Sequence, residues 1–158
     1  MYASGARKPT QRRTTLLAAE DDPDDRALIS DALQECCDVA DLRFVSDGEE
    51  LMDYLRGRGR YADRRANPLP GLVLLDLKMP KKDGFDVLTE AKGDRILRQI
   101  PIVVLSTSRS EADVARSYEL GVNSYISKPH MFSELVEAMR ALVHYWFDVV
   151  SLAPAAGA

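Results

Sequence analysis

The stretch LVLLDLKMPKKDGFDVL, residues 72–88, decides the fold. It opens on a continuous apolar run of the kind that parallel sheets bury on both faces, so we predict a strand over residues 71–75. A carboxylate, Asp76, follows this run at once. Apolar residues then recur at helical spacing, which predicts a helix over residues 83–97 unless Gly93 ends it early. A strand, an acid and a helix in this order are one unit of an α/β fold.

The same alternation of apolar runs and helical patterns extends to both sides of this stretch. Four more strands are predicted over residues 15–19, 42–45, 102–105 and 124–127, and four more helices over residues 24–37, 49–56, 111–120 and 132–150. Asp22 before Pro23 is a predicted N-cap, and Ser110 with Asp113 a predicted capping box. Strands that alternate with helices predict a parallel sheet joined by right-handed crossovers.

Two features depart from this rhythm. Residues 57–70, GRGRYADRRANPLP, are polar, basic and punctuated by Gly and Pro, so we predict a long exposed loop there. Cys36 and Cys37 are adjacent in the sequence. Because neighbouring cysteines rarely bridge each other, we expect two free thiols in a reducing compartment.

Length and charge limit the classes of protein to consider. A chain of 158 residues fits one globular domain, and its net charge of −4 argues against a nucleic-acid binder. No apolar run approaches the ~18 residues of a membrane span, and the basic start lacks the apolar core of a secretory signal. We therefore expect a cytoplasmic protein with a flexible basic tail over residues 1–13, one domain over residues 14–150 with an extended last helix, and a flexible tail over residues 151–158.

Polar residues stand directly after the predicted strands. Glu20 and Asp21 follow the first strand, Asp76 the third, Ser106 the fourth and Lys128 the fifth. In an open parallel sheet these groups meet at the carboxyl edge, where ligands bind. Carboxylates this close repel one another unless a hard cation such as Mg²⁺ neutralises them, and a central carboxylate can attack phosphorus. The pattern predicts a magnesium-dependent phosphoryl acceptor.

Four motifs carry a resemblance to the receiver domains of two-component response regulators. They are LLAAEDDPDD at residues 16–25, the stretch around Asp76, IPIVVLSTS at residues 100–108 and GVNSYISKP at residues 121–129. The resemblance covers residues 14–142. It implies a flavodoxin-like α/β fold, with a five-stranded parallel sheet in the order 2-1-3-4-5 and helices on both faces.

The resemblance also implies which residues handle phosphate. Asp76 stands at the phosphoacceptor position, and Glu20 and Asp21 at the acidic pair, with Asp21 the more direct Mg²⁺ ligand. The backbone carbonyl of Lys78 stands where the family supplies another ligand, and Lys128 is the family's lysine. The Lys78 side chain occupies a position where Asn is common, so it is expected to modulate the lifetime of the acyl phosphate.

A second group of residues is implied to carry the conformational switch. Ser106 stands at the switch-hydroxyl position, with Thr107 and Ser108 as neighbours that modulate it or take its place. Tyr125 stands at the aromatic switch position. Pro129 is expected to follow a cis peptide bond.

The basic loop and the ending YWFDVVSL resemble a narrower group, the single-domain regulators paired with phytochrome histidine kinases. This implies a phytochrome-type kinase as phosphodonor and no DNA-binding output domain. In the last helix Leu142, Phe147 and Val150 lie partly outside the stripe that is predicted to face the core, which consists of Val136, Met139, Val143 and Trp146. We expect a homodimer through the fourth and fifth helices and the fifth strand, or else a segment over residues 145–152 that folds back on its own subunit.

Two other functions compete with a signalling receiver. A phosphatase of the haloacid-dehalogenase type also uses an aspartate nucleophile after a strand, but it requires a second Asp where Lys78 stands. A receiver-like module that binds partners without phosphorylation would not need the set Asp21, Asp76, Ser106 and Lys128. The expected reaction is therefore self-phosphorylation and slow autodephosphorylation, not catalysis on an external substrate.

Overall fold

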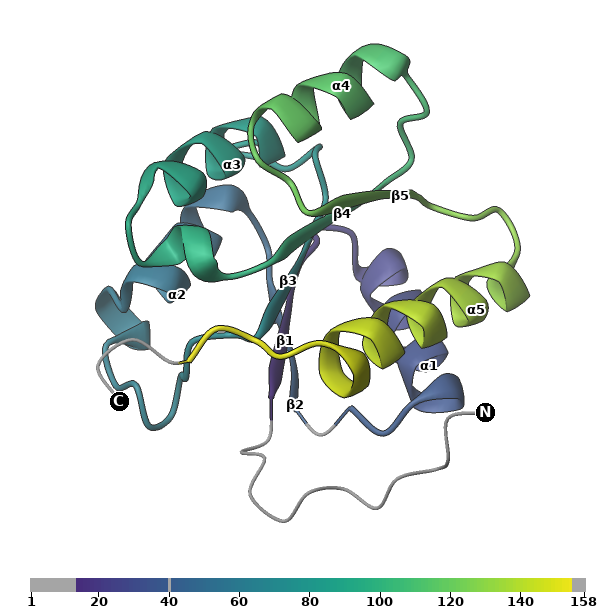
Figure 1. Ribbon diagram of the computed structural model, residues 1–158, viewed down its shortest axis with the longest axis horizontal. Helices are drawn as coiled ribbons and strands as arrows, with labels where there is room; N and C mark the ends of the chain where they lie inside the picture. The colour runs from purple at the N-terminus through teal and green to yellow at the C-terminus, as the bar shows by residue number, and fades with distance from the viewer. Residues whose placement is uncertain (1–13, 40, 155–158) are drawn as a thin grey trace.

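The structure, a computed structural model, describes residues 14–39 and 41–154. Five parallel strands form one sheet in the order β2-β1-β3-β4-β5, which confirms the predicted topology (Figure 1). The strands are β1 Thr15–Ala19, β2 Asp41–Val45, β3 Leu72–Leu75, β4 Ile102–Ser106 and β5 Ser124–Ser127. The expected tail over residues 1–13 and the end of the tail over residues 151–158 lie outside the described residues.

Helices cover both faces of the sheet (Figure 1). They are α1 Pro23–Cys36, α2 Gly48–Arg56, α3 Gly84–Gly93, α4 Glu111–Glu119 and α5 Phe132–Val143. One core cluster joins the sheet to α1 and α5, and a second joins it to α2 and α3. Within β1, Leu16 faces the first cluster and Leu17 the second, as the alternation of side chains along a strand requires. None of the helices in the described ranges is both long and apolar enough to cross a membrane.

Strand order fixes where a ligand site lies. β1 pairs with β2 on one side and with β3 on the other. The sheet therefore grows in one direction from β1 to β2 and in the opposite direction from β3 onward, and the switch point lies between β1 and β3. The register sets Ala19 opposite Leu75, the last residues of these two strands. The residues that follow each strand, Glu20 and Asp76, therefore emerge side by side at the switch point of the sheet.

Acidic and hydroxyl caps start the helices next to this edge. The Asp22 carboxylate accepts a hydrogen bond from the Asp24 N–H at 2.8 Å, which confirms the predicted N-cap of α1. Ser110 caps α4 by accepting from the Asp113 N–H at 3.4 Å. The reciprocal half of the predicted capping box is missing, because the Asp113 carboxylate accepts from the Ser108 hydroxyl at 2.6 Å instead.

The basic segment over residues 57–70 is a loop with one short helical turn, Gly59–Tyr61, and it is only partly exposed, because some of its residues pack against the protein. Gly57, with φ of 66°, ends α2 and turns the chain back along the helix. The Arg64 guanidinium then donates to the carbonyls of Tyr54 and Leu55 in the last turn of the helix. Tyr61 is buried, and its ring centroid lies 4.8 Å from that of Tyr54.

The expectation of free thiols was wrong, because a disulfide joins Cys36 and Cys37. Cys36 is the last residue of α1, and Cys37 leaves the helix with an extended backbone, φ −148° and ψ 153°. This change of conformation within one residue brings together two sulfurs that either a continuous helix or a continuous strand would keep apart.

The last helical segment extends almost as far as predicted, but its end is not α-helical. α5 ends at Val143, and residues His144–Val149 form a wider π-helical turn. Leu142 is buried, whereas the sequence placed it partly outside the core stripe. Trp146 and Phe147 both pack against the core of their own chain, as the fold-back alternative predicts.

Candidate functional site

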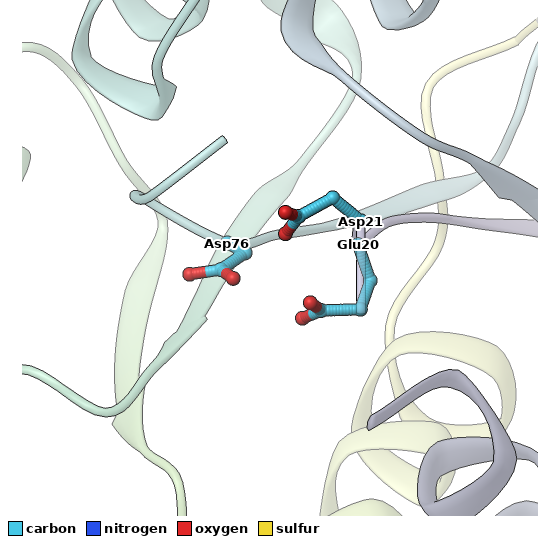
Figure 2. Close-up of side chains that lie close together, drawn as sticks. All are labelled: Glu20, Asp21 and Asp76. Carbon is cyan, nitrogen blue, oxygen red and sulfur yellow. The ribbon is translucent and has the colours of Figure 1, made fainter. Parts of the chain in front are cut away.

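Three carboxylates meet at the carboxyl ends of β1 and β3. One oxygen each from Glu20, Asp21 and Asp76 lies within 4.8 Å of the other two, and the side chains turn toward a common space (Figure 2). Glu20 is 2% exposed and Asp76 9%, while Asp21 faces solvent. An all-oxygen set that is open on one side suits a hard divalent cation that keeps part of its water shell. The residues present therefore fit a metal of the Mg²⁺ class.

Burial and like charge act together on Glu20. Burial is the main cause that raises its pKa to about 7; the Asp76 charge acts in the same direction, and a hydrogen bond from Lys128 acts against both. Carboxylates held this close gain from a neighbouring positive charge, which favours their ionised forms. The local electrostatics therefore favour cation binding at this edge of the sheet.

Lys128, directly after β5, brings a positive charge into this cluster. Its Nζ donates to Glu20 Oε2 at 2.9 Å and to Asp25 Oδ2 at 3.1 Å, and lies 3.7 Å from Asp76 Oδ2. Burial lowers the pKa of Lys128, but the hydrogen bond to Glu20 and the charge of Asp76 outweigh it and raise the pKa above its usual range. Lys128 therefore stays charged beside the central carboxylate.

Sequence reasoning missed Asp25. It lies three residues after the N-cap Asp22, in the first turn of α1, where the helix begins at the carboxyl edge of the sheet. Five of the six residues that follow β1 are acids, so the composition alone did not show which of them turn toward the site. Counting one helical turn from the N-cap would have singled out Asp25 as facing back toward the strand ends.

Ser106 and Tyr125 are linked through the same short loop. The Ser106 side chain is fully buried at the end of β4, and its Oγ accepts from the Ser108 N–H at 3.2 Å. The Tyr125 hydroxyl donates to the Ser108 carbonyl at 2.8 Å, while its ring packs against the core on the α2 and α3 face. Thr107 is exposed. A movement of the Ser106 hydroxyl would therefore be felt by the backbone that holds Tyr125.

Lys78 and Pro129 complete the predicted set. The Lys78 side chain is exposed, and its N–H donates to Asp76 Oδ1 at 3.2 Å. The expected cis bond before Pro129 is absent, since every peptide bond among residues 14–39 and 41–154 is trans. The trans form is the lower-energy one even before proline, and here the Lys128 N–H keeps a 2.7 Å hydrogen bond to the Ser106 carbonyl.

Known proteins share this sequence and this fold. A family model described as the response regulator receiver domain matches residues 16–140. The response regulator Rcp1 of Synechocystis sp. is 39% identical over 141 residues, which are 89% of this chain and 93% of Rcp1. A solved Mn²⁺-bound form of Rcp1 superposes with a TM-score of 0.80 at 37% identity, covering 89% of this chain and 99% of that one.

Two further solved structures are similar over nearly their whole length. RPA3017, a response regulator in red light signalling of R. palustris, is 41% identical with a TM-score of 0.85, covering 89% of this chain and 99% of its own. The phosphorylated cyanobacterial phytochrome response regulator RcpA is 40% identical with a TM-score of 0.83, and the match covers 90% of this chain and 100% of RcpA. Together with the family match over residues 16–140, these likenesses show that the chain belongs to the response regulator receiver domain family.

Proposed function

We propose that this protein is a phosphoacceptor in a two-component phosphorelay, with Asp76 as the residue that takes the phosphoryl group. The proposal rests on one observation: Asp76 lies at the strand-end switch point between two acidic residues and the ammonium of Lys128. An Asp76 oxygen attacks the phosphorus of a phosphohistidine. The P–N bond breaks, and its electron pair returns to an imidazole that carries a proton on its other nitrogen and leaves neutral.

Glu20, Asp21 and Asp76 are the side chains that would hold Mg²⁺, with the Lys78 carbonyl as a further ligand. A bound Mg²⁺ supplies positive charge to the peripheral oxygens of the transferred phosphoryl group. The all-oxygen donor set supports a hard cation, and the Mn²⁺-bound form of Rcp1 supports a divalent one. Lys128 supplies a second positive charge, fixed in place by two carboxylates.

We infer that the phosphodonor is a phytochrome-type histidine kinase. RPA3017 is described as a response regulator in red light signalling, and RcpA as a phytochrome response regulator. Each is about as similar to this chain as Rcp1 is. In such a pathway the chain consumes one phosphoryl group per cycle on its own carboxylate and does not turn over an external substrate.

The test is transfer from a radiolabelled, autophosphorylated phytochrome histidine kinase. We expect the label to move from the kinase to this chain when Mg²⁺ is present and to stay on the kinase when EDTA replaces it. A histidine kinase of an unrelated pathway is the control for the donor, and it should transfer far more slowly. If the label stayed on every kinase, and acetyl phosphate also failed to phosphorylate the chain, the proposed function would be wrong.

The face made by α4, β5 and α5 is our proposed output surface. Ser106 and Tyr125 connect it to the phosphorylation site through the Ser108 backbone. The segment after α5 keeps exposed apolar side chains, with Tyr145 51% and Val149 59% exposed. We infer that this face and the turn that follows α5 form a homodimer interface.

Substitution of Val149 tests the homodimer. Val149→Asp should convert a dimer to a monomer in sedimentation equilibrium at micromolar concentration, because it places a charge in the apolar interface. Leu28→Asp is the matched control, since Leu28 is 44% exposed but lies on α1, outside this face. A wild-type protein that sediments as a monomer, phosphorylated or not, would count against the interface.

A further inference from the structure

Asp25 is a charged residue of the site to which neither the sequence motifs nor the family resemblance gives a role. Its carboxylate comes from the first turn of α1 and reaches Lys128, the residue directly after β5 and 103 residues later in the chain. The Asp25 Oδ2 to Lys128 Nζ distance is 3.1 Å, and the side chains of Lys128 and Asp25 are 13% and 35% exposed. The pair is therefore partly shielded from solvent, where a charged hydrogen bond is worth more than on an open surface.

The α1 cap does not require this carboxylate. Asp22 already accepts the N–H groups of Asp24 and Asp25, at 2.8 and 3.4 Å. Asp24 supplies a second negative charge to the same positive helix end. What distinguishes Asp25 from Asp24 is its bond to Lys128.

The ammonium of Lys128 has three N–H donors in a tetrahedral arrangement. Two are used at hydrogen-bond length, by Glu20 at 2.9 Å and by Asp25 at 3.1 Å. The next carboxylate oxygen, Asp76 Oδ2, lies 3.7 Å from the Lys128 Nζ, which is too long for a hydrogen bond. A phosphoryl oxygen carried on Asp76 would be the acceptor for the third N–H.

We propose that Asp25 is a positioning residue that fixes the Lys128 ammonium, so that its third N–H is free and aimed at the phosphoryl group on Asp76. This role rests on the proposed function of Asp76 as phosphoacceptor. Glu20 alone leaves the ammonium free to turn about a single bond and to close onto the Asp76 oxygen. Asp25 removes that freedom before the phosphoryl group arrives, so less ordering is needed during the transfer.

The experiment measures the rate of phosphorylation by acetyl phosphate at saturating Mg²⁺. Asp25→Asn should slow it about fivefold, the equivalent of about 1 kcal/mol for one hydrogen bond to a charged group at a partly exposed position. Asp25→Glu, which keeps the charge on a longer arm, should recover part of the loss. Asp24→Asn is the matched control, because it removes the same charge from the same turn of α1, and it should stay within about twofold of wild type.

A double-mutant cycle with Lys128→Gln separates positioning from a general effect of charge or folding. In the Lys128→Gln background Asp25→Asn should have no further effect on beryllofluoride binding, a stand-in for the phosphoryl group, measured by calorimetry. Equal losses from Asp25→Asn with and without Lys128, or equal losses from the Asp24 and Asp25 variants, would overturn the role. A wild-type chain that takes no phosphate would instead overturn the proposed function, so the two failures are distinguishable.

Discussion

Asp76→Asn should lower phosphoryl uptake at least about a hundredfold, both from acetyl phosphate and from a histidine kinase. The substitution is nearly isosteric, and the amide oxygen can still accept the Lys78 N–H that Asp76 Oδ1 accepts at 3.2 Å. The lost property is chemical, because an amide lacks the anionic oxygen that attacks phosphorus. The substitution also removes one of the three carboxylates that surround the cation site, so Mg²⁺ affinity should fall as well.

Asp86→Asn is the control for this experiment. Asp86 is an exposed acid in the first turn of α3, the helix that follows the loop after Asp76, and it takes no part in the acidic cluster. Its variant should be labelled at the wild-type rate. Uptake by Asp76→Asn at the wild-type rate would show that another residue accepts the phosphoryl group.

The sequence predicts the sheet well because its strands are short, continuous apolar runs. When such runs alternate with helices, few sheet topologies are possible. The order of the strands then follows from the resemblance and from the handedness of the crossovers. The convergence of Glu20, Asp76 and Lys128 follows from the same topology, since all three come directly after strands. The roles of these residues remain a proposal that the experiments above test.

What the sequence could not supply depends on contacts between distant segments. Arg64 looks like a solvated charge until the turn at Gly57 places it over the end of α2. Phe147, which the helical spacing placed partly outside the core stripe, packs against the core where the last turn widens after Val143. Asp25 gains a partner from the far end of the chain. In each case the side chain could equally be exposed to solvent or contact another segment, and tertiary packing decides which.

Gly48→Ala should destabilise the fold by about 2–3 kcal/mol, the usual cost of overpacking at a site that cannot yield easily. Gly48 is the buried first residue of α2, and a Cβ there would lie 2.0 Å from the backbone oxygen of Lys82 and 2.7 Å from its carbonyl carbon. The neighbour is backbone, so no side chain can rotate away. Either α2 or the loop between β3 and α3 has to move.

Gly93→Ala is the matched control, because it adds the same methyl group to a helix where nothing lies within 4 Å. It should be neutral or up to about 1 kcal/mol more stable, since alanine is the better helix former. Urea unfolding followed by circular dichroism measures both. Equal midpoints for the two variants would show that the contact between α2 and the loop is not tight.

The same loop gives Gly48→Ala a second expected effect. Asp76 precedes the loop and Lys78, the proposed source of a carbonyl ligand, lies within it, so a shift at Lys82 should disturb the cation site as well as the fold. We expect the folded Gly48→Ala protein to need more Mg²⁺ for half-maximal phosphorylation than the Gly93→Ala protein. A loss of stability with unchanged Mg²⁺ dependence would mean that α2 moves and the loop does not. The Mg²⁺ titration therefore shows which of the two elements yields to the added methyl group.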